Sequence, residues 1–260
     1  MIRNDKNKIV LFTRNSSTAH AIYNSISSQY DIETVVLEDQ EKVKSLLKRR
    51  IRRLGLFATI GQVLFTKLIA KRLISKSKKR CTEIIKENAL NFNRIPKEKM
   101  RRTASVNSPG VIKFLQETNP DLVVVVSTSI FSKETLSSVN CKFINLHTGI
   151  TPEYRGNACA YWALANSEPQ NVGVTVHFID EGIDTGGIIH QRNVSITPQD
   201  NYATYSALQL SEGLKLLNTA IGEYFDGTIS VQKKEGSKSR LWYSPTIWQY
   251  LYYRMKKGVK

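Results

Sequence analysis

An amide, an imidazole and a carboxylate occur in one stretch of the sequence, between Phe143 and Ile189. Asn145 and His147 are two residues apart on a segment that contains glycine and proline, and Asp184 lies between two glycine turns. The amide can hydrogen-bond a carbonyl oxygen that becomes an oxyanion, and the imidazole can exchange a proton near neutral pH. The carboxylate can fix the tautomer of the imidazole. These side chains therefore suit acyl transfer.

No serine or cysteine lies in a recognisable nucleophile setting such as G-x-S-x-G. The acceptor would then attack directly, without a covalent enzyme intermediate. Spacing alone leaves a second interpretation open, in which Asn145 forms a turn, His147 is a hydrogen-bonded loop histidine and Asp184 forms an Asx turn. We assign purely structural roles to His177 and His190 at this stage.

Five ordered elements over the 45 residues from Asn145 to Ile189 favour the chemical interpretation. They are N-x-H from Asn145, a loop that ends in P-x-x-R-G at Gly156, Trp162, G-V-T-x-H from Gly173, and D-x-G from Asp184. This stretch resembles the formyltransferase family that uses 10-formyltetrahydrofolate. The resemblance extends more loosely from the first strand to Phe225, but it does not cover residues 42–80.

The resemblance implies that Asn145, His147 and Asp184 are catalytic residues in the transfer of a formyl group from the folate to a primary amine. Asn145 and a protonated His147 would stabilise the developing oxyanion. Asp184 would orient His147 and help remove the ammonium proton. The pterin of this co-substrate would be held largely by backbone groups, and no metal is implied. The cofactor-binding positions are Ser127, Thr128, Ser129, Ile130, Phe131, Asp180 and Gly182.

The acceptor is inferred from departures from the family pattern. The first strand-to-helix turn, residues 13–18, lacks the glycines that wrap a phosphate in relatives acting on glycinamide ribonucleotide. Only 76 residues follow Asp184, whereas methionyl-tRNA formyltransferases carry a sizeable C-terminal RNA-binding domain. We therefore expect a nucleotide-linked amino sugar, with a 4-amino-4,6-dideoxyhexose favoured. The expected substrate-binding residues are Arg14, Ser16, Ser17, Tyr154, Arg155 and Gly156.

Two other functions stay open. One is a methionyl-tRNA formyltransferase-like enzyme that uses its basic segment for RNA. This segment offers few aromatic side chains for base stacking, so we disfavour a nucleic-acid partner. The other is a non-enzymatic basic module that binds nucleic acid or a membrane surface, although such a module has no need for the complete set of Asn145, His147 and Asp184.

The net charge of +16 is concentrated in residues 42–80, which carry fourteen Lys and Arg and no acidic residue. The rest of the chain is nearly neutral, at +2. Within this insertion, residues 54–70 are apolar nearly all round. We expect a helical excursion that packs on the domain or across a homodimer. The alternative is an in-plane helix on an anionic membrane, which would suit an enzyme of lipopolysaccharide O-antigen biosynthesis. If residues 54–70 are helical, one face of the helix would carry Leu54, Phe57, Leu64, Phe65 and Leu68.

The elements that must position the site follow a strand–helix–strand pattern from the start of the chain. The apolar run at 121–127 is typical of a strand buried on both faces of a parallel sheet. A strand at 143–146 would deliver Asn145 and His147 to a loop at its end. Further strands are expected at 8–13, 32–37, 172–179 and 187–196, and helices from about 17, over 107–118, over 202–225 and from Ser244-Pro245.

These elements predict a Rossmann-like, doubly wound and mostly parallel sheet with a small C-terminal elaboration. The catalytic domain would span 1–200, including the insertion 42–80, and a C-terminal helix and elaboration would span 201–260. A hydrophobic fraction of 41% excludes a disordered protein. No apolar run has the length of a membrane span, and the polar residues 1–6 argue against a secretory signal. Three scattered cysteines fit a cytoplasmic setting, with membrane association through 42–80 as the open alternative.

Overall fold

A computed structural model describes residues 7–232, 234 and 238–260. The segment 1–6, from which we argued against a secretory signal, lies outside the described residues. Among the helices of the described part, none combines the length and apolar character needed to cross a lipid bilayer.

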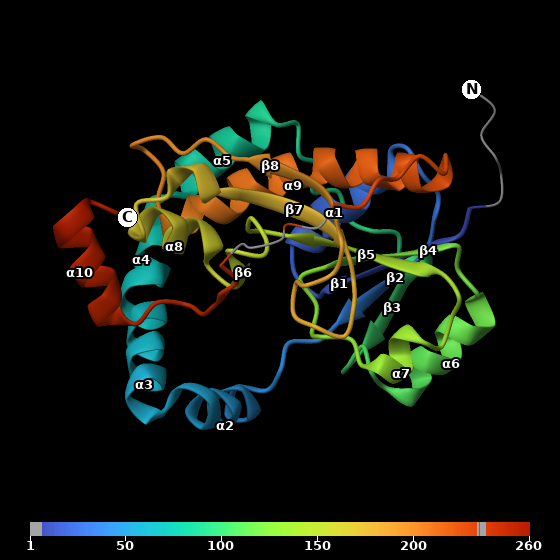
Figure 1. Cartoon of the computed structure of the whole chain (residues 1–260), viewed down its shortest axis with the longest axis horizontal. Helices are drawn as coiled ribbons and strands as arrows, with labels where there is room; N and C mark the ends of the chain where they lie inside the picture. The colour runs from blue at the N-terminus through green and yellow to red at the C-terminus, as the bar shows by residue number, and fades with distance from the viewer. Residues whose placement is uncertain (1–6, 233, 235–237) are drawn as a thin grey trace.

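A seven-stranded sheet in the order β3-β2-β1-β4-β5-β7-β8 forms the centre of the molecule (Figure 1). The strands β1 to β5 pair in parallel, whereas β7 and β8 run antiparallel at one edge. The prediction of a doubly wound, mostly parallel sheet is thereby confirmed. The strands are β1 (Ile9–Arg14), β2 (Ile32–Glu38), β3 (Met100–Thr103), β4 (Leu122–Val126), β5 (Lys142–His147), β7 (Gly173–Phe178) and β8 (Ile188–Asn193).

Helices cover both faces of the sheet, because alternate residues of each central strand face opposite sides. In β1, Ile9 and Leu11 belong to the core beneath α1 (Thr18–Ser27) and α9 (Tyr202–Phe225). Val10 and Phe12 belong to the second core, beneath α6 (Pro109–Thr118). A short helix, α7 (Lys133–Leu136), lies beside α6 (Figure 1).

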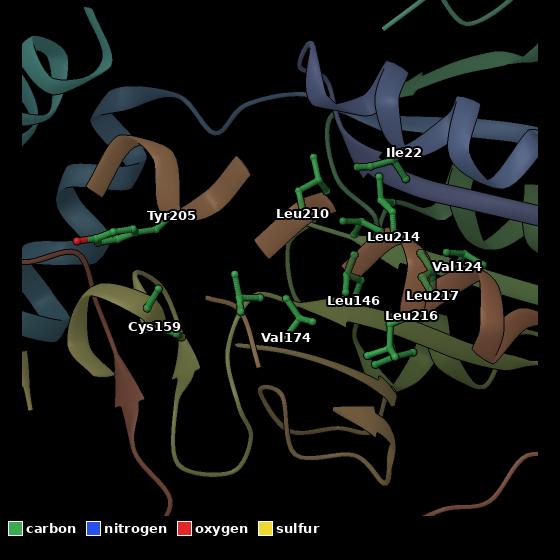
Figure 2. Packing of buried hydrophobic residues seen from close by; sticks show 14 of the residues in the cluster. Ile22, Val124, Leu146, Cys159, Val174, Tyr205, Leu210, Leu214, Leu216 and Leu217 are labelled. Carbon is green, nitrogen blue, oxygen red and sulfur yellow. The ribbon is translucent and has the colours of Figure 1, made fainter. Parts of the chain in front are cut away.

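The larger core joins α1 and α9 to the middle of the sheet. Figure 2 shows Ile22 of α1, Val124 of β4 and Leu146 of β5 around the leucines of α9. Among those leucines, Leu214 and Leu217 are buried, with 2% and 0% of their surface exposed. This packing fixes the strand ends that carry the predicted site.

Two sequence predictions about elements are wrong in detail. Asn145 and His147 lie within β5 itself rather than on the following loop, because the strand continues to His147. The last helix, α10 (Ile247–Lys257), begins after Thr246 rather than at Ser244. Thr246 and Gln249 form a capping box that starts the helix there, with the Thr246 hydroxyl accepting the Gln249 N–H at 3.2 Å.

The basic insertion is helical. It contains α2 (Val43–Leu54), α3 (Leu56–Leu64), a π-helical segment (Phe65–Ala70), α4 (Lys71–Lys76) and the start of α5 (Lys78–Glu87). We call residues 56–76, which comprise α3, the π segment and α4, the arm. Its inner side contacts α10 and α9. In Figure 1, α2, α3 and α4 extend away from the sheet and are followed by α5.

The prediction that Phe57 and Phe65 share one face of the insertion is wrong. Phe65 is 1% exposed and packs edge-on against Tyr202, while Phe57 is 73% exposed. Two features change the direction of the residues. Gly55 has φ +85 and separates α2 from α3, and the π-helical turns rotate the residues that follow.

The C-terminal part is built onto the same core. The helix α9 packs across β5, β7 and β8, and β9 (Leu241–Trp242) pairs with β6 (Arg155–Gly156) in a second, two-stranded sheet. Two aromatic helices, α8 (Cys159–Ala165) and α10, contact each other through Tyr161 and Tyr250. The division of the chain near residue 200 stays a prediction. The two remaining short helices are 3₁₀ turns at Lys97–Lys99 and Pro169–Asn171.

Candidate active site

Asn145 and His147 project from the same face of β5, because side chains two residues apart on a strand point the same way. They lie at the carboxyl end of this strand, where open α/β sheets place their ligands. The antiparallel neighbour β7 sets His177 directly opposite Asn145 in the register. Strand pairing thus brings three polar side chains to one sheet edge.

The loop between β7 and β8 completes the group with Asp184. Its Oδ2 lies 3.4 Å from His147 Nδ1, and its Oδ1 lies 3.5 Å from Asn145 Nδ2. Asp184 has φ +51, a left-handed conformation that Asp tolerates better than most residues. The Gly156 N–H donates to Asp184 Oδ2 at 3.0 Å, and the Arg155 guanidinium donates to the Ile183 carbonyl at 2.9 Å. The strand β6 therefore holds the Asp184 turn from the other side.

His147 is buried, with 6% of its surface exposed. Its Nε2 lies 2.9 Å from the Tyr154 carbonyl oxygen, which can only accept, so Nε2 carries the proton and Nδ1 faces Asp184. Burial lowers the pKa of His147 from its ordinary 6.5, and the opposing charge of Asp184 only partly offsets this. His147 is therefore neutral near pH 7 in the free protein, unlike the protonated state that the resemblance implied.

The Asp184 carboxylate is held ionised. Burial raises its pKa, but the neighbouring His147, the contact with His177 and the Gly156 N–H outweigh this and bring the pKa to about 2. A neutral imidazole with its basic nitrogen next to a carboxylate is a strong proton acceptor, because the imidazolium that forms gains an ion pair.

His177 belongs to this site, although the sequence analysis assigned it a structural role. Its Nδ1–H donates to the Phe178 carbonyl at 2.7 Å, which leaves Nε2 free to accept the Asn145 amide N–H at 3.0 Å. The amide of Asn145 is thus oriented by His177. The histidine at the end of the G-V-T-x-H element was the signal that could have revealed this role.

Cys159 also lies next to His147, with its Sγ 3.6 Å from Nε2. Burial and the nearby Asp184 raise the pKa of this thiol, so it is not an ionised nucleophile. This fits the expectation of direct attack by the acceptor.

A cavity of about 770 Å³ opens beside these residues. Asn145, His147, His177 and Asp184 line it. Every position predicted for the folate lines it too, namely Ser127, Thr128, Ser129, Ile130, Phe131, Asp180 and Gly182. The strand-end loop after β4 and the turn before Asp184 therefore meet around one space.

Two polar side chains that the sequence did not reveal, the buried Glu38 and the half-buried Asn107, hold the loop after β4. Glu38, the last residue of β2, accepts the Ser129 N–H at 2.7 Å and the Val106 N–H at 3.3 Å. Its carboxylate also lies 3.5 Å from the Arg14 guanidinium. Asn107 donates to the Ile130 carbonyl at 2.9 Å and accepts the Ser132 N–H at 2.7 Å. A carboxylate that ends an apolar strand was the available signal for Glu38.

The residues predicted to bind the acceptor divide into two groups. Arg14 and Gly156 line the cavity, whereas Ser16 and Ser17 are exposed and lie outside the set of described residues that line it. For Tyr154 and Arg155 the structure corrects the prediction that they bind the acceptor. The Tyr154 ring is buried and donates its hydroxyl to Glu168 at 2.6 Å. The Arg155 guanidinium binds the Asp184 turn instead of facing the cavity.

Over residues 7–232, 234 and 238–260, no cluster of three or more His, Cys, Asp or Glu side chains has the geometry of a metal site.

The model of one family, described as formyl transferase, matches residues 7–221. The chain belongs to the formyl transferase family. This match covers the seven-stranded sheet, most of the residues that line the cavity and most of α9, and the family that the sequence motifs indicated is confirmed.

Among curated relatives of this formyl transferase, methionyl-tRNA formyltransferase of Thermodesulfovibrio yellowstonii is 37% identical over 137 residues, which cover 52% of this chain and 43% of the relative. The chain spans about half the length of the curated relatives it matches.

Solved structures of several formyltransferases share the fold. A 4-N formyltransferase from Francisella tularensis is 18% identical, with TM-score 0.58, and the match covers 90% of this chain and 75% of that one. A sugar 3N-formyltransferase named WlaRD, solved with dTDP and 5-N-formyl-THF, is 16% identical, with TM-score 0.54. This match covers 91% of this chain and 69% of WlaRD. Glycinamide ribonucleotide transformylase 1 from Symbiobacterium toebii is 18% identical, with TM-score 0.57, and the match covers 92% of this chain and 95% of that one. The fold alone therefore does not distinguish the acceptors.

Proposed function

We propose that this formyl transferase moves the formyl group of 10-formyltetrahydrofolate to the primary amine of a nucleotide-linked amino sugar. The observation that carries the proposal is the convergence of Asn145 and His147 on Asp184 within one cavity of about 770 Å³. An amide donor, a neutral imidazole and an ionised carboxylate are the groups that amine formylation needs.

The cavity wall is suited to the folate. Ile130, half exposed, and Ile179 offer apolar surface for a flat ring, and Ser127 to Ser129 offer backbone groups beside it. Glu38 and Asn107 fix this loop through its backbone. When bound, the folate supplies the electrophilic formyl carbon and an N10 leaving group.

His147 acts as the proton carrier in this proposal. The neutral amine attacks the formyl carbon, and its nitrogen becomes an ammonium. Nδ1 of His147 takes one proton from this nitrogen, and the resulting imidazolium is stabilised by Asp184, 3.4 Å away. His147 then returns the proton to N10 of the folate as the C–N10 bond breaks. The products are a formamide and tetrahydrofolate, so protons balance.

Asn145 stabilises the charge that develops on the formyl oxygen. One N–H of its amide is committed to His177 at 3.0 Å, while the other makes only a 3.5 Å contact with Asp184. The weaker contact leaves that N–H able to turn to the oxyanion. His177 is thus a positioning residue for the Asn145 amide.

The acceptor class has separate support. Residues 13–18 contain no glycine, so this turn does not offer the close backbone approach to a phosphate expected for glycinamide ribonucleotide. Among the structural relatives, WlaRD is named as a sugar 3N-formyltransferase, and the Francisella tularensis protein is named as a 4-N formyltransferase. Among such acceptors, a 4-amino-4,6-dideoxyhexose stays the favoured candidate, and a role in O-antigen assembly follows from it as a proposal.

A formyl-transfer assay with a panel of acceptors tests the function. The panel contains nucleotide-linked 3-amino and 4-amino sugars, glycinamide ribonucleotide and methionyl-tRNA. We expect formylation of one amino sugar, and its loss in Asn145→Ala. The matched control is Asn171→Ala, whose side chain contacts Glu168 outside the cavity. Turnover of glycinamide ribonucleotide alone would contradict the proposed acceptor.

Methionyl-tRNA is the second candidate acceptor, favoured by one observation. The curated relatives that share up to 38% identity with parts of this chain are named methionyl-tRNA formyltransferases. Formylation of the tRNA alone would replace the sugar by this acceptor and leave the roles of Asn145 and His147 unchanged.

A further inference from the structure

The basic insertion lines the cavity that contains the candidate active site. One face of α2 contributes Arg49, Arg50 and Arg53 to the cavity wall, together with Leu46 and Leu54. Gln62 of α3 lines the same cavity and donates to the Ser244 carbonyl at 2.8 Å, so it ties the insertion to the opposite segment. The charge of this helix therefore faces the reaction space as well as the solvent.

Two of the arginines have no acidic partner. Arg49 pairs with Glu41 at 2.5 Å, and Arg14, across the cavity, pairs with Glu38 at 3.5 Å. Within the described part of the chain, neither Arg50 nor Arg53 forms an ion pair. Arg50 is half-buried, and burial together with the adjacent Arg49 lowers its pKa. A half-buried cation beside another cation is costly without an anion to meet it.

We infer that Arg50 and Arg53 form a subsite for the diphosphate of a nucleoside diphosphate, on the wall of the cavity that contains Asn145, His147 and Asp184. This subsite rests on the proposed function and specifies how its acceptor is held. Guanidinium groups suit phosphate oxygens because their fork of donors can bind two oxygens at once. Tyr243 lines the same cavity and offers a ring for the base or sugar.

The position of these arginines favours a small nucleotide over RNA. Arg50 and Arg53 line the cavity, whereas Lys48 and Arg52 of the same helix are exposed outside its described lining. A small diphosphate needs only the inner pair. A polyanion would use the outer cations too, and its affinity would fall steeply with salt.

Titration calorimetry with dTDP, UDP and the free nucleosides tests the subsite without any assay of turnover. In Arg50→Gln/Arg53→Gln we expect affinity for the preferred diphosphate to fall roughly 10–100-fold, with the nucleoside unaffected. The matched control is Lys48→Gln/Arg52→Gln, which removes the same charge from the outer side. An equal loss in both double variants, or none in the inner one, overturns the subsite.

The same experiment separates this inference from the proposed function. Diphosphate binding that depends on Arg50 and Arg53, in a protein that formylates no sugar, would retain the subsite and refute the acceptor. A larger loss of methionyl-tRNA affinity than of diphosphate affinity in the inner variant would overturn the small-nucleotide assignment. Binding of 10-formyltetrahydrofolate is expected to be unchanged and confirms that the cavity is intact.

The outer side of the arm supports a second inference, independent of the cavity. In this segment polar or small residues face the protein, with Thr59, Gly61 and Gln62 buried. Most of the large apolar side chains face outward and are 38–73% exposed, although Phe65 is buried and Val63, Ile69 and Leu73 are half-buried. This burial pattern is the reverse of an ordinary amphipathic helix. The exposed residues are Leu56, Phe57, Ile60, Leu64, Leu68 and Ile74.

We propose that this face enters the headgroup region of an anionic membrane. An apolar stripe on a helix with many Lys and Arg is the pattern of interfacial helices. Residues 42–80 carry +14 without one acidic residue, which complements anionic lipid. A second copy of this chain would instead bring two such segments together, and their like charges would repel. Phe57 stacks on Trp248 at 4.2 Å, which extends the face with an aromatic pair suited to an interface.

Sedimentation with phosphatidylglycerol-containing vesicles tests this face, with pure phosphatidylcholine vesicles as the comparison. We expect salt-sensitive binding to the anionic vesicles that falls about tenfold or more in Leu64→Ser/Leu68→Ser. Val231→Ser, an exposed apolar residue away from the arm, is the matched control. Absence of anionic binding overturns the proposal. A dimer in analytical ultracentrifugation that dissociates in Leu64→Ser/Leu68→Ser would assign the face to a second copy.

Discussion

The carboxyl end of β5, which carries Asn145 and His147, differs from the arm in which side chains are buried and which are exposed. At the sheet edge, buried polar groups meet protein partners at 2.9–3.5 Å, and apolar residues such as Leu146 are buried. In the arm, Thr59 and Gln62 are buried while Phe57 is exposed. The first region is explained by contacts within the chain. In the second region Gln62 and Phe65 have partners within the chain, whereas the exposed apolar side chains are the basis of the membrane contact that we propose.

Electrostatics separate the site around Asp184 from the basic insertion, residues 42–80, in a similar way. Asp184 holds its charge at low pH because His147, His177 and Gly156 stabilise it. In α2, Arg50 has a like charge as its neighbour, and burial lowers its pKa. A satisfied charge stabilises the fold, whereas an unsatisfied charge in a cavity predisposes the site to bind an anion.

The largest effect is expected at the sheet edge. His147→Ala removes the proton carrier, and we expect kcat to fall roughly 10²–10³-fold or more. His190→Ala is the matched control, because His190 pairs with Glu223 at 2.6 Å outside the cavity. Steady-state kinetics with 10-formyltetrahydrofolate measures both. Near-normal turnover in His147→Ala would remove this residue from the mechanism.

One pair of identical substitutions compares the two regions in stability. Leu217→Ala, in the fully buried core, should cost about 2–5 kcal/mol in the free energy of unfolding. Leu68→Ala, on the exposed face of the arm, should change it by about 0.5 kcal/mol or less. Urea denaturation monitored by circular dichroism measures both. A cost for Leu68→Ala as large as for Leu217→Ala would show that the arm packs as a core element.

A smaller effect is expected at the loop after β4. Glu38→Gln keeps the size of the side chain but weakens its bonds to the Ser129 and Val106 N–H groups. We expect the KM for the folate to rise roughly tenfold with little change in kcat, the scale of one weakened charge-assisted bond. Asp39→Asn, at the exposed neighbouring position, is the control. A fall in kcat without a change in KM would contradict a role in folate positioning.

The smallest expected effect is a shift in a pH profile. In the proposed mechanism neutral His147 is the active form, so kcat/KM should fall as the pH drops through a pKa below 6.5. Asp184 raises this pKa by its charge, so Asp184→Asn should move the acidic limb to still lower pH while reducing the rate. If the acidic limb of the kcat/KM profile moved to higher pH in Asp184→Asn, Asp184 would not raise the pKa of His147, and the roles assigned to the two residues would be contradicted.

The sequence predicted most of the sheet and the helix over 202–225, because buried β-branched runs and a 3.6-residue apolar period are local signals. It also brought Asn145, His147 and Asp184 together through a family resemblance. Local signals marked Glu38 and His177 as candidates, but their roles depend on contacts between strands distant in sequence, so no local pattern identified their partners. Tyr154 and Arg155 were assigned to the acceptor for the same reason, since burial of a tyrosine or the direction of a guanidinium is a tertiary property.

The insertion shows the limit of helical periodicity. An ideal helix places Phe57, Phe65 and Leu68 on one face, but Phe65 is buried at the start of the π-helical segment while Phe57 and Leu68 are exposed. The charge of this segment was evident from the sequence. That one face of α2 lines the same cavity as Asn145 became evident only from the tertiary arrangement.

The most direct test of the central claim is formyl transfer from 10-formyltetrahydrofolate to a dTDP-linked 4-amino-4,6-dideoxyhexose, followed by product mass. The intact protein should add one formyl group to the sugar amine, His147→Ala should abolish this, and Arg50→Gln/Arg53→Gln should raise the KM for the sugar nucleotide. Transfer that survives in His147→Ala, or that occurs only with methionyl-tRNA in place of every sugar, would contradict the account.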